Sequence, residues 1–347
     1  MAGNVNHVCV VSPTIYHLGR QGYGGIERLV TLFVKGLTEE GIAVTCVCPA
    51  GSRLPWGVRR VETGDAVYDF REPGLLPALK RVEWESMNCT LDFSHSKNVG
   101  RLCGPPGKHI SPIWHDPIIM QPPVPGHNVV ALSKWQADRF EITYQQGCRV
   151  FDPICIDVSP VASLPDMEYL LFIGKLDPSK GALAAIGIAK ALKERLVIVG
   201  PVTPGDPPHY VEQVLALCDG KDIIYEGEVG DDYKNSLIAG AKALLYPVSY
   251  PAEYGEAHSH KAVEAMAYGT PCIIYDQGAM REIVEDGVTG FLISPNVTVE
   301  SCGLALKACA TLDRAKCKER ALERWHYQAV VKRWIGLIEE VAEGAVW

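Results

Sequence analysis

The chain has 347 residues, of which 47% are apolar and 21% are charged. A chain of this length exceeds one ordinary hydrophobic core, so we expect two globular domains. The formal net charge of −8 disfavours nucleic acid as a partner. The longest apolar runs, such as residues 169–173, fall far short of the ~20 residues of a membrane span, so we expect no transmembrane segment.

The compartment is indicated by the start of the chain and by its cysteines. The first residues, MAGNVNHVCVV, lack the basic segment and apolar run of a signal peptide, so we expect a cytoplasmic protein. None of the 12 cysteines forms a Cys-x-x-Cys motif, and most lie in apolar, strand-like runs. We expect buried thiols, although their even number leaves a disulfide framework open.

Strand-like and helix-like segments alternate along the chain, which is typical of parallel sheets covered by helices. The pattern is weakest over residues 49–77 and clearest in the second half. We expect the α/β class, with two facing doubly wound, Rossmann-like domains. The expected domains are residues 1–160, residues 161–325, and a C-terminal helix over 326–347 that packs back on the first domain.

Doubly wound sheets bind ligands at the carboxyl ends of their strands, so functional residues should follow strands. The loop after the first strand ends in Gly22-Tyr23-Gly24-Gly25, just before a helix. Glycines let the backbone approach a ligand, and the helix N-terminus offers N–H groups to a phosphate. A flexible turn that only needs positive φ angles is the alternative.

Two lysines, Lys175 and Lys180, flank the turn after the strand-like run YLLFI. Ammonium groups on both sides of such a turn can neutralise a diphosphate, whose charge grows when it leaves a sugar. The alternative is a pair of solvated surface lysines.

Two carboxylates, Glu256 and Glu264, lie eight residues apart in the segment YGEAHSHKAVEAMAYGTP. If Glu256 precedes a helix that contains Glu264, the two backbones differ by about 12 Å along the axis, which is the scale of a nucleotide sugar. Carboxylates accept paired hydrogen bonds from vicinal hydroxyls, as in a sugar or a ribose. The alternative is that each glutamate caps or pairs locally.

Four motifs follow one another between Val8 and Ile293. They are Gly24-Gly25-Ile26-Glu27, Gly174-Lys175-Leu176-x3-Lys180-Gly181, Glu256-x7-Glu264-Ala-Met-Ala-x-Gly-Thr-Pro and Glu285-Asp286-Gly287-x-Thr289-Gly290-Phe291. Together they resemble the family 4 glycosyltransferases of the GT-B fold.

The resemblance implies that residues 1–160 form the acceptor side and that residues 161–325 bind the nucleotide sugar. It also implies a role for each matching residue. His115 would face the reacting sugar, Glu256 would hold the transferred sugar, and Lys180 would stabilise the leaving diphosphate, so these three are the expected catalytic residues. The expected donor-binding residues are Gly24, Gly25, Lys175, Lys180 and Glu264, with Glu264 on the ribose.

The resemblance also implies a retaining transfer of a hexose from a nucleoside-diphosphate sugar, with uridine diphosphate (UDP) as the commonest carrier. The donor is then a substrate, and no cofactor or metal is required. The acceptor stays open between a glycan, a glycolipid and a small molecule. Two alternatives remain: another GT-B enzyme, such as a nucleotide-sugar epimerase or a phosphorylase, and a nonenzymatic two-domain sugar-binding protein.

Some positions depart from the family pattern. Lys175 stands where the family more often has arginine, and Ala257-His258-Ser259 replaces Pro-Phe-Gly, which affects the shape of the sugar site. His258 and His260 with Glu256 could also be read as a metal site, but a further ligand at suitable spacing is missing. Ser133 resembles a serine at a strand end and is expected to cap a helix.

Overall fold

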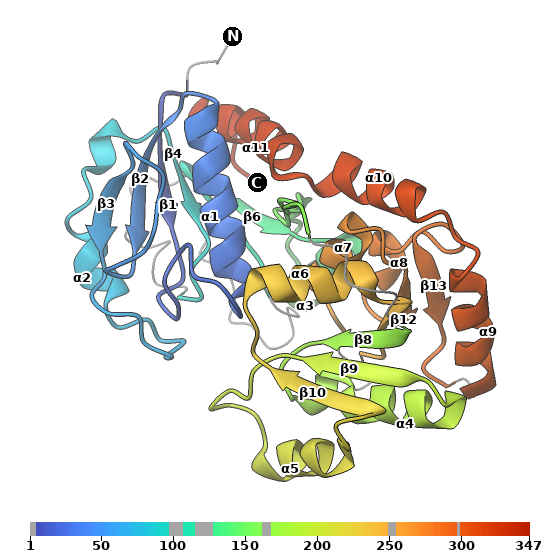
Figure 1. Cartoon of the computed structure of the whole chain (residues 1–347). Coiled ribbons are helices and arrows are strands. Elements are labelled where there is room, and N and C mark those ends of the chain that lie inside the picture. Colours follow the sequence, from blue (N-terminus) through green and yellow to red (C-terminus); the bar gives the residue numbers. More distant parts are fainter. Residues whose placement is uncertain (1–4, 97–106, 115–127, 162–167, 249–254, 297–298) are drawn as a thin grey trace. The chain divides into compact units, whose positions relative to one another are not determined.

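The computed structural model describes residues 5–96, 107–114, 128–161, 168–248, 255–296 and 299–347 (Figure 1). It divides into two compact units. The first unit comprises Met1–Arg20, Gly24–Asp157 and Trp325–Trp347, and the second comprises Gln21–Tyr23 and Val158–Arg324.

The first unit is built on a parallel sheet in the order β3-β2-β1-β4-β5-β6-β7. Its strands are β1 (His7–Val11), β2 (Ala43–Cys48), β3 (Arg59–Glu62), β4 (Cys89–Asp92), β5 (His109–Pro112), β6 (Asn128–Ala131) and β7 (Arg149–Val150). Its helices are α1 (Gly25–Glu39), α2 (Leu75–Leu79), the 3-10 helix η1 (Trp84–Ser86), α3 (Lys134–Tyr144) and α11 (Tyr327–Ala342).

The C-terminal helix α11 contributes to the core of the first unit. Its Trp334 is fully buried, and its ring lies 5.3 Å from that of Phe33 on α1 and 5.4 Å from that of Phe151. Large aromatic side chains bury more apolar area than any others, so these contacts stabilise the packing of α11 against α1 and against the segment that follows β7.

The second unit has a parallel sheet in the order β10-β9-β8-β11-β12-β13. Its strands are β8 (Tyr169–Ile173), β9 (Arg195–Val199), β10 (Ile223–Gly227), β11 (Ala243–Tyr246), β12 (Cys272–Tyr275) and β13 (Gly290–Ile293). Its helices are η4 (Pro178–Lys180), α4 (Ala182–Leu192), α5 (Pro208–Leu217), α6 (Asp231–Gly240), α7 (His260–Ala267), α8 (Met280–Ile283), α9 (Val299–Cys309) and α10 (Arg314–Trp325).

The strand order reverses once in each sheet, between β1 and β4 and between β8 and β11. At such a point the loops after neighbouring strands leave toward opposite faces, and ligands bind between them. The expected pair of doubly wound α/β domains is therefore confirmed, and each sheet has one place where a site should form.

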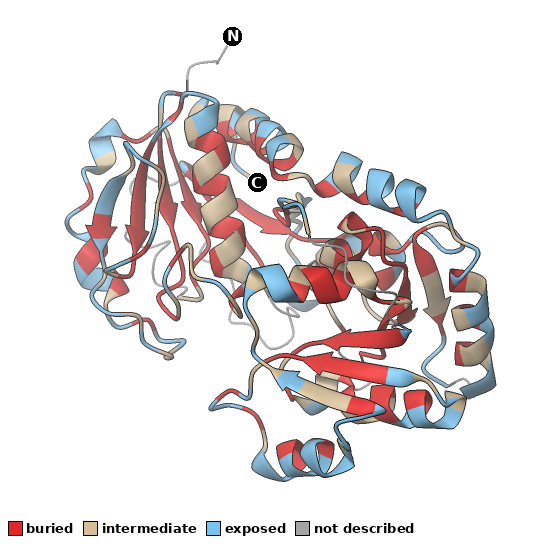
Figure 2. Ribbon diagram, viewed as in Figure 1, coloured by how far each residue is buried: buried red, intermediate tan, exposed pale blue. Residues whose placement is uncertain are grey.

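The central strands are buried on both faces while the covering helices keep an exposed side (Figure 2). Nine of the eleven cysteines in the described ranges are buried, and all eleven are free thiols, as expected. Among the helices of the described residues, none is long and apolar enough to cross a membrane.

Candidate functional site

The loop after β8 is shaped by Asp177 and Gly181. Asp177 precedes η4, and its carboxylate accepts hydrogen bonds from the N–H and the hydroxyl of Ser179 at 2.9 and 2.5 Å. Gly181 has φ +83°, and a Cβ atom there would lie 2.1 Å from the carbonyl oxygen of Pro247, which follows β11. The turn that carries the two lysines is therefore packed directly against the end of β11.

Lys180 and Glu256 meet at this switch point. The Lys180 Nζ lies 2.8 and 3.1 Å from the two carboxylate oxygens of Glu256, and the side chains are only 14% and 12% exposed. The two residues predicted to stabilise the diphosphate and to hold the sugar thus lie together, as an ion pair.

The backbone of Glu256 is fixed by the turn after β12. The N–H of Ala279 donates to the Glu256 carbonyl at 2.9 Å. Gly278, with φ +65°, packs so closely that a Cβ atom there would lie 2.4 Å from the same oxygen. No sequence argument singled out Gly278, because its role depends on β12 lying beside β11.

Replacement of Gly278 tests how firmly the turn holds Glu256. An alanine at either Gly278 or Gly287 must adopt a positive φ, which costs about 1–2 kcal/mol. A Cβ on Gly287 meets no atom within 4 Å, whereas one on Gly278 collides with the Glu256 backbone. We expect Gly278→Ala to lower the free energy of unfolding by at least about 1 kcal/mol more than Gly287→Ala in urea titrations. If both variants lose the same free energy of unfolding, the turn can shift to accommodate the added Cβ and does not hold Glu256 firmly.

Glu264 lies on α7, which begins at His260 with Ser259 as its N-cap, so Glu256 precedes the helix and Glu264 lies within it, as expected. Its carboxylate lies 2.7 Å from the Nζ of Lys234 on α6 and 3.9 Å from Nε2 of His260. Lys234 is buried, and the sequence analysis missed it. The predicted ribose ligand is therefore held by a lysine.

Lys175 lies between two carboxylates. Its Nζ is 3.2 Å from Asp177 and 3.4 Å from Asp206. Asp206 is buried and also accepts a hydrogen bond of 2.7 Å from the N–H of Thr203. The charge of Lys175 is thus already countered twice, so a diphosphate would have to share this ammonium with both acids.

Lys261, in the first turn of α7, was also missed. It is half-buried, and its Nζ lies 6.0 Å from the ring centre of Tyr246. Burial lowers the pKa of Lys261 to about 8; Lys180 and Lys175 add to this, and Glu256 and Glu264 oppose it. A signal was present in the sequence, because Lys261 precedes Glu264 by three residues and so shares its helix face.

The glycine loop of the first unit has a carboxylate beside it. Gly24 immediately precedes α1 and Gly25 is its first residue. The buried Glu27 lies next to Gly24 and accepts hydrogen bonds from its own N–H and from that of Tyr16. Burial raises the pKa of Glu27 to about 7. A phosphate at this helix N-terminus would therefore lie close to a carboxyl group, whose negative charge grows as the pH rises past 7.

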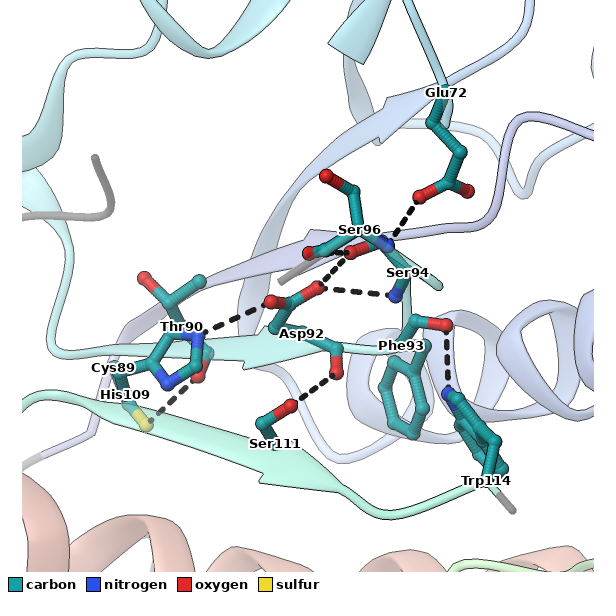
Figure 3. A network of polar contacts seen from close by, with 10 residues as sticks. All are labelled: Glu72, Cys89, Thr90, Asp92, Phe93, Ser94, Ser96, His109, Ser111 and Trp114. Atoms are coloured by element: carbon teal, nitrogen blue, oxygen red, sulfur yellow. Dashed lines mark hydrogen bonds and ion pairs between the residues drawn. The ribbon is translucent and has the colours of Figure 1, made fainter. Parts of the chain in front are cut away.

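A buried polar network follows β4 in the same unit (Figure 3). Glu72, at φ +49°, accepts from the N–H groups of Thr14 and Ser96 at 2.9 and 2.7 Å, so it ties the loop after β1 to the loop after β4. Burial raises the pKa of Glu72 to about 7. Asp92 accepts from Ser94 and lies 3.3 Å from Nε2 of His109. A non-glycine residue at positive φ is uncommon, and at Glu72 the hydrogen bonds to both loops hold this conformation.

Two further predictions concern the first unit. Ser133 caps α3 by accepting from the N–H of Gln136 at 3.2 Å, as expected. His115 lies outside the described residues, so its role remains a prediction.

Within the described ranges, no three histidine, cysteine or acidic side chains form a group that could hold a metal ion. Glu256, His258 and His260 all lie in these ranges and do not form one.

Part of the chain is similar to known glycosyltransferases. Residues 160–324 match the family model described as glycosyl transferases group 1. The chain is 27% identical to the lipopolysaccharide 1,2-N-acetylglucosaminetransferase of Salmonella typhimurium. The match extends over 184 residues, which is 49% of this chain. The match spans only 47% of the length of that relative.

Two solved structures extend the likeness to the whole chain. AviGT4, a glycosyltransferase involved in avilamycin A biosynthesis, is 25% identical, with a TM-score of 0.76 over 99% of both chains. HepE of Anabaena, solved with UDP and glucose, is 15% identical, with a TM-score of 0.68 over 96% of this chain and 100% of its own, and shares the fold. The chain therefore has the GT-B fold, and its residues 160–324 are similar to the glycosyl transferases group 1.

Proposed function

We propose that this chain transfers a hexose from a nucleoside-diphosphate sugar, with UDP as the carrier, to an acceptor hydroxyl while the anomeric configuration is retained. The observation that carries the proposal is the Lys180–Glu256 pair at the switch point of the second unit. It joins an ammonium for a leaving phosphate to a carboxylate for sugar hydroxyls, in the segment that matches the family model.

The chemistry requires few side-chain proton transfers. The bond between the anomeric carbon and the β-phosphate oxygen breaks, and a bond to the acceptor oxygen forms on the same face. The acceptor proton passes to the departing phosphate oxygen. Lys180 stabilises the negative charge that develops there, which is the largest contribution expected of such a site. Glu256 and Glu264 accept hydrogen bonds from sugar and ribose hydroxyls.

The choice of UDP is supported by the Anabaena protein of the same fold, which was solved with UDP and glucose. The lysines also supply the positive charge that a divalent cation provides in other transferases, so we propose that transfer needs no metal. The acceptor stays undefined.

Donor turnover in the presence of EDTA tests this proposal. Incubated with UDP-hexoses and with other nucleotide sugars, the chain should release nucleoside diphosphate slowly by hydrolysis, with water as the acceptor. A phosphorylase would instead make a sugar phosphate from the glycoside and inorganic phosphate, and an epimerase would change the sugar without releasing it. A binding protein would leave every donor intact, which would contradict the proposal.

A further inference from the structure

The charges of the second-unit site are largely matched in pairs. Lys180 faces Glu256, and Lys234 faces Glu264. Lys175 faces both Asp177 and Asp206. Because each of these ammonium groups already has an acidic partner, an incoming diphosphate competes with a carboxylate for every one of them.

Lys261 differs from the other lysines of the site. Within the part of the chain that the structure describes, no carboxylate forms an ion pair with its ammonium, whose Nζ lies 6.0 Å from the ring centre of Tyr246. The side chain is half-buried on the helix face that carries Glu264. A cation that has lost solvent and gained no close counter-ion is in an unfavourable state, and a bound anion would relieve it.

We propose that Lys261 is a third diphosphate-binding residue, whose ammonium contacts the donor phosphates together with Lys180 and Lys175. This inference rests on the proposed donor function. It extends that function because Lys261 belongs to none of the residues that the family motifs assign.

Titration of Lys261 gives the proposal a specific signature. The pKa of about 8 in the free chain should rise when a phosphate dianion binds beside the ammonium. The contribution of Lys261 to the affinity should then be constant below pH 8 and fall as the pH rises above it, because binding requires uptake of a proton. The charged groups around Lys261 are Lys180, Lys175, Glu256 and Glu264, with Lys234 and His260 beside Glu264.

Calorimetric titration of the full chain with UDP tests the inference. At pH 8.5, in two buffers of different ionisation enthalpy, the wild-type chain should take up roughly half to one proton per UDP bound. Lys261→Met should abolish this uptake and weaken binding at pH 7.5 by roughly tenfold to a hundredfold. Lys261→Arg keeps a charge that does not titrate, so it should bind UDP without the fall above pH 8.

Lys242→Met is the matched control. Lys242 precedes β11 at the opposite end of the strand and pairs with Glu194 at 2.8 Å, so its loss should leave binding and proton uptake unchanged. Wild-type affinity and uptake in Lys261→Met would overturn the inference even if donors are hydrolysed. If proton uptake on UDP binding depends on Lys261 but no donor is hydrolysed, the inference is supported and the proposed transfer is contradicted. A wild-type chain that binds neither UDP nor inorganic pyrophosphate would overturn both.

Discussion

Lys180→Met is expected to lose most of the affinity for UDP and, in addition, about 3 kcal/mol of stability, which is the lower end of the cost of breaking a buried ion pair. The stability is lost because Glu256, only 12% exposed, would keep its negative charge without the ammonium 2.8 Å away. The affinity is lost because a charge-assisted contact contributes roughly 1.5–3 kcal/mol, or about tenfold to a hundredfold in the dissociation constant. Urea unfolding and calorimetric titration measure the two losses separately.

The double variant Lys180→Met/Glu256→Gln separates the structural role of Lys180 from its binding role. Removal of both charges should restore much of the stability, since the carboxylate that lost the Lys180 ammonium is removed with it. UDP affinity should stay low, because the diphosphate still lacks its ammonium. If the double variant regains UDP affinity together with stability, Lys180 only positions Glu256 and does not touch the diphosphate.

The fold could be predicted from the sequence because parallel strands and covering helices alternate with a clear period. The helix start between Glu256 and Glu264 was predictable for the same reason. The order of strands was not, since the period of a segment says nothing about its neighbours in the sheet. Gly278 gains its role only because β12 pairs with β11, and Lys234 only because α6 brings it to Glu264. Such residues carry no local signal.

The sequence left open whether the charged residues of the candidate site bind a ligand or pair locally, and in the structure they form ion pairs with one another. Lys175, which was expected to grip a diphosphate, is held by Asp177 and the buried Asp206. Carboxylates and ammonium groups chosen to bind a charged sugar nucleotide attract one another when no ligand separates them. The sequence shows that such pairing is possible but does not identify the partners, because they lie far apart along the chain, as Lys180 and Glu256 do.

This internal pairing bears on how a donor binds. A diphosphate that takes Lys180 must share it with Glu256, so the net gain per contact is smaller than for a free lysine. The same pairing keeps both side chains in place before the donor arrives, which lowers the entropy cost of binding. When the donor binds, the Glu256 carboxylate can accept hydrogen bonds from the sugar while the Lys180 ammonium contacts the phosphate.

Replacement of the two glutamates is expected to separate their roles. Glu256→Gln should lower transfer from the sugar nucleotide by about tenfold or more, since a charge-assisted hydrogen bond to the sugar is lost. Its affinity for bare UDP should be unchanged or higher, because UDP has no sugar for Glu256 to hold and Lys180 is no longer shared with a carboxylate. Binding of UDP and turnover of the donor are measured on the same preparation.

Glu264→Gln should weaken UDP and the sugar nucleotide alike, by roughly tenfold to a hundredfold, because both carry the ribose that Glu264 is expected to hold. This change also removes the carboxylate that lies 2.7 Å from the buried Lys234, so Glu264→Gln/Lys234→Met is needed as the control. If the control regains stability but not UDP affinity, Glu264 contacts the nucleotide directly. If instead Glu256→Gln loses UDP and Glu264→Gln loses only transfer, the two carboxylates exchange roles. The sugar then lies along α7, and the ribose lies beside the turn that holds Gly278.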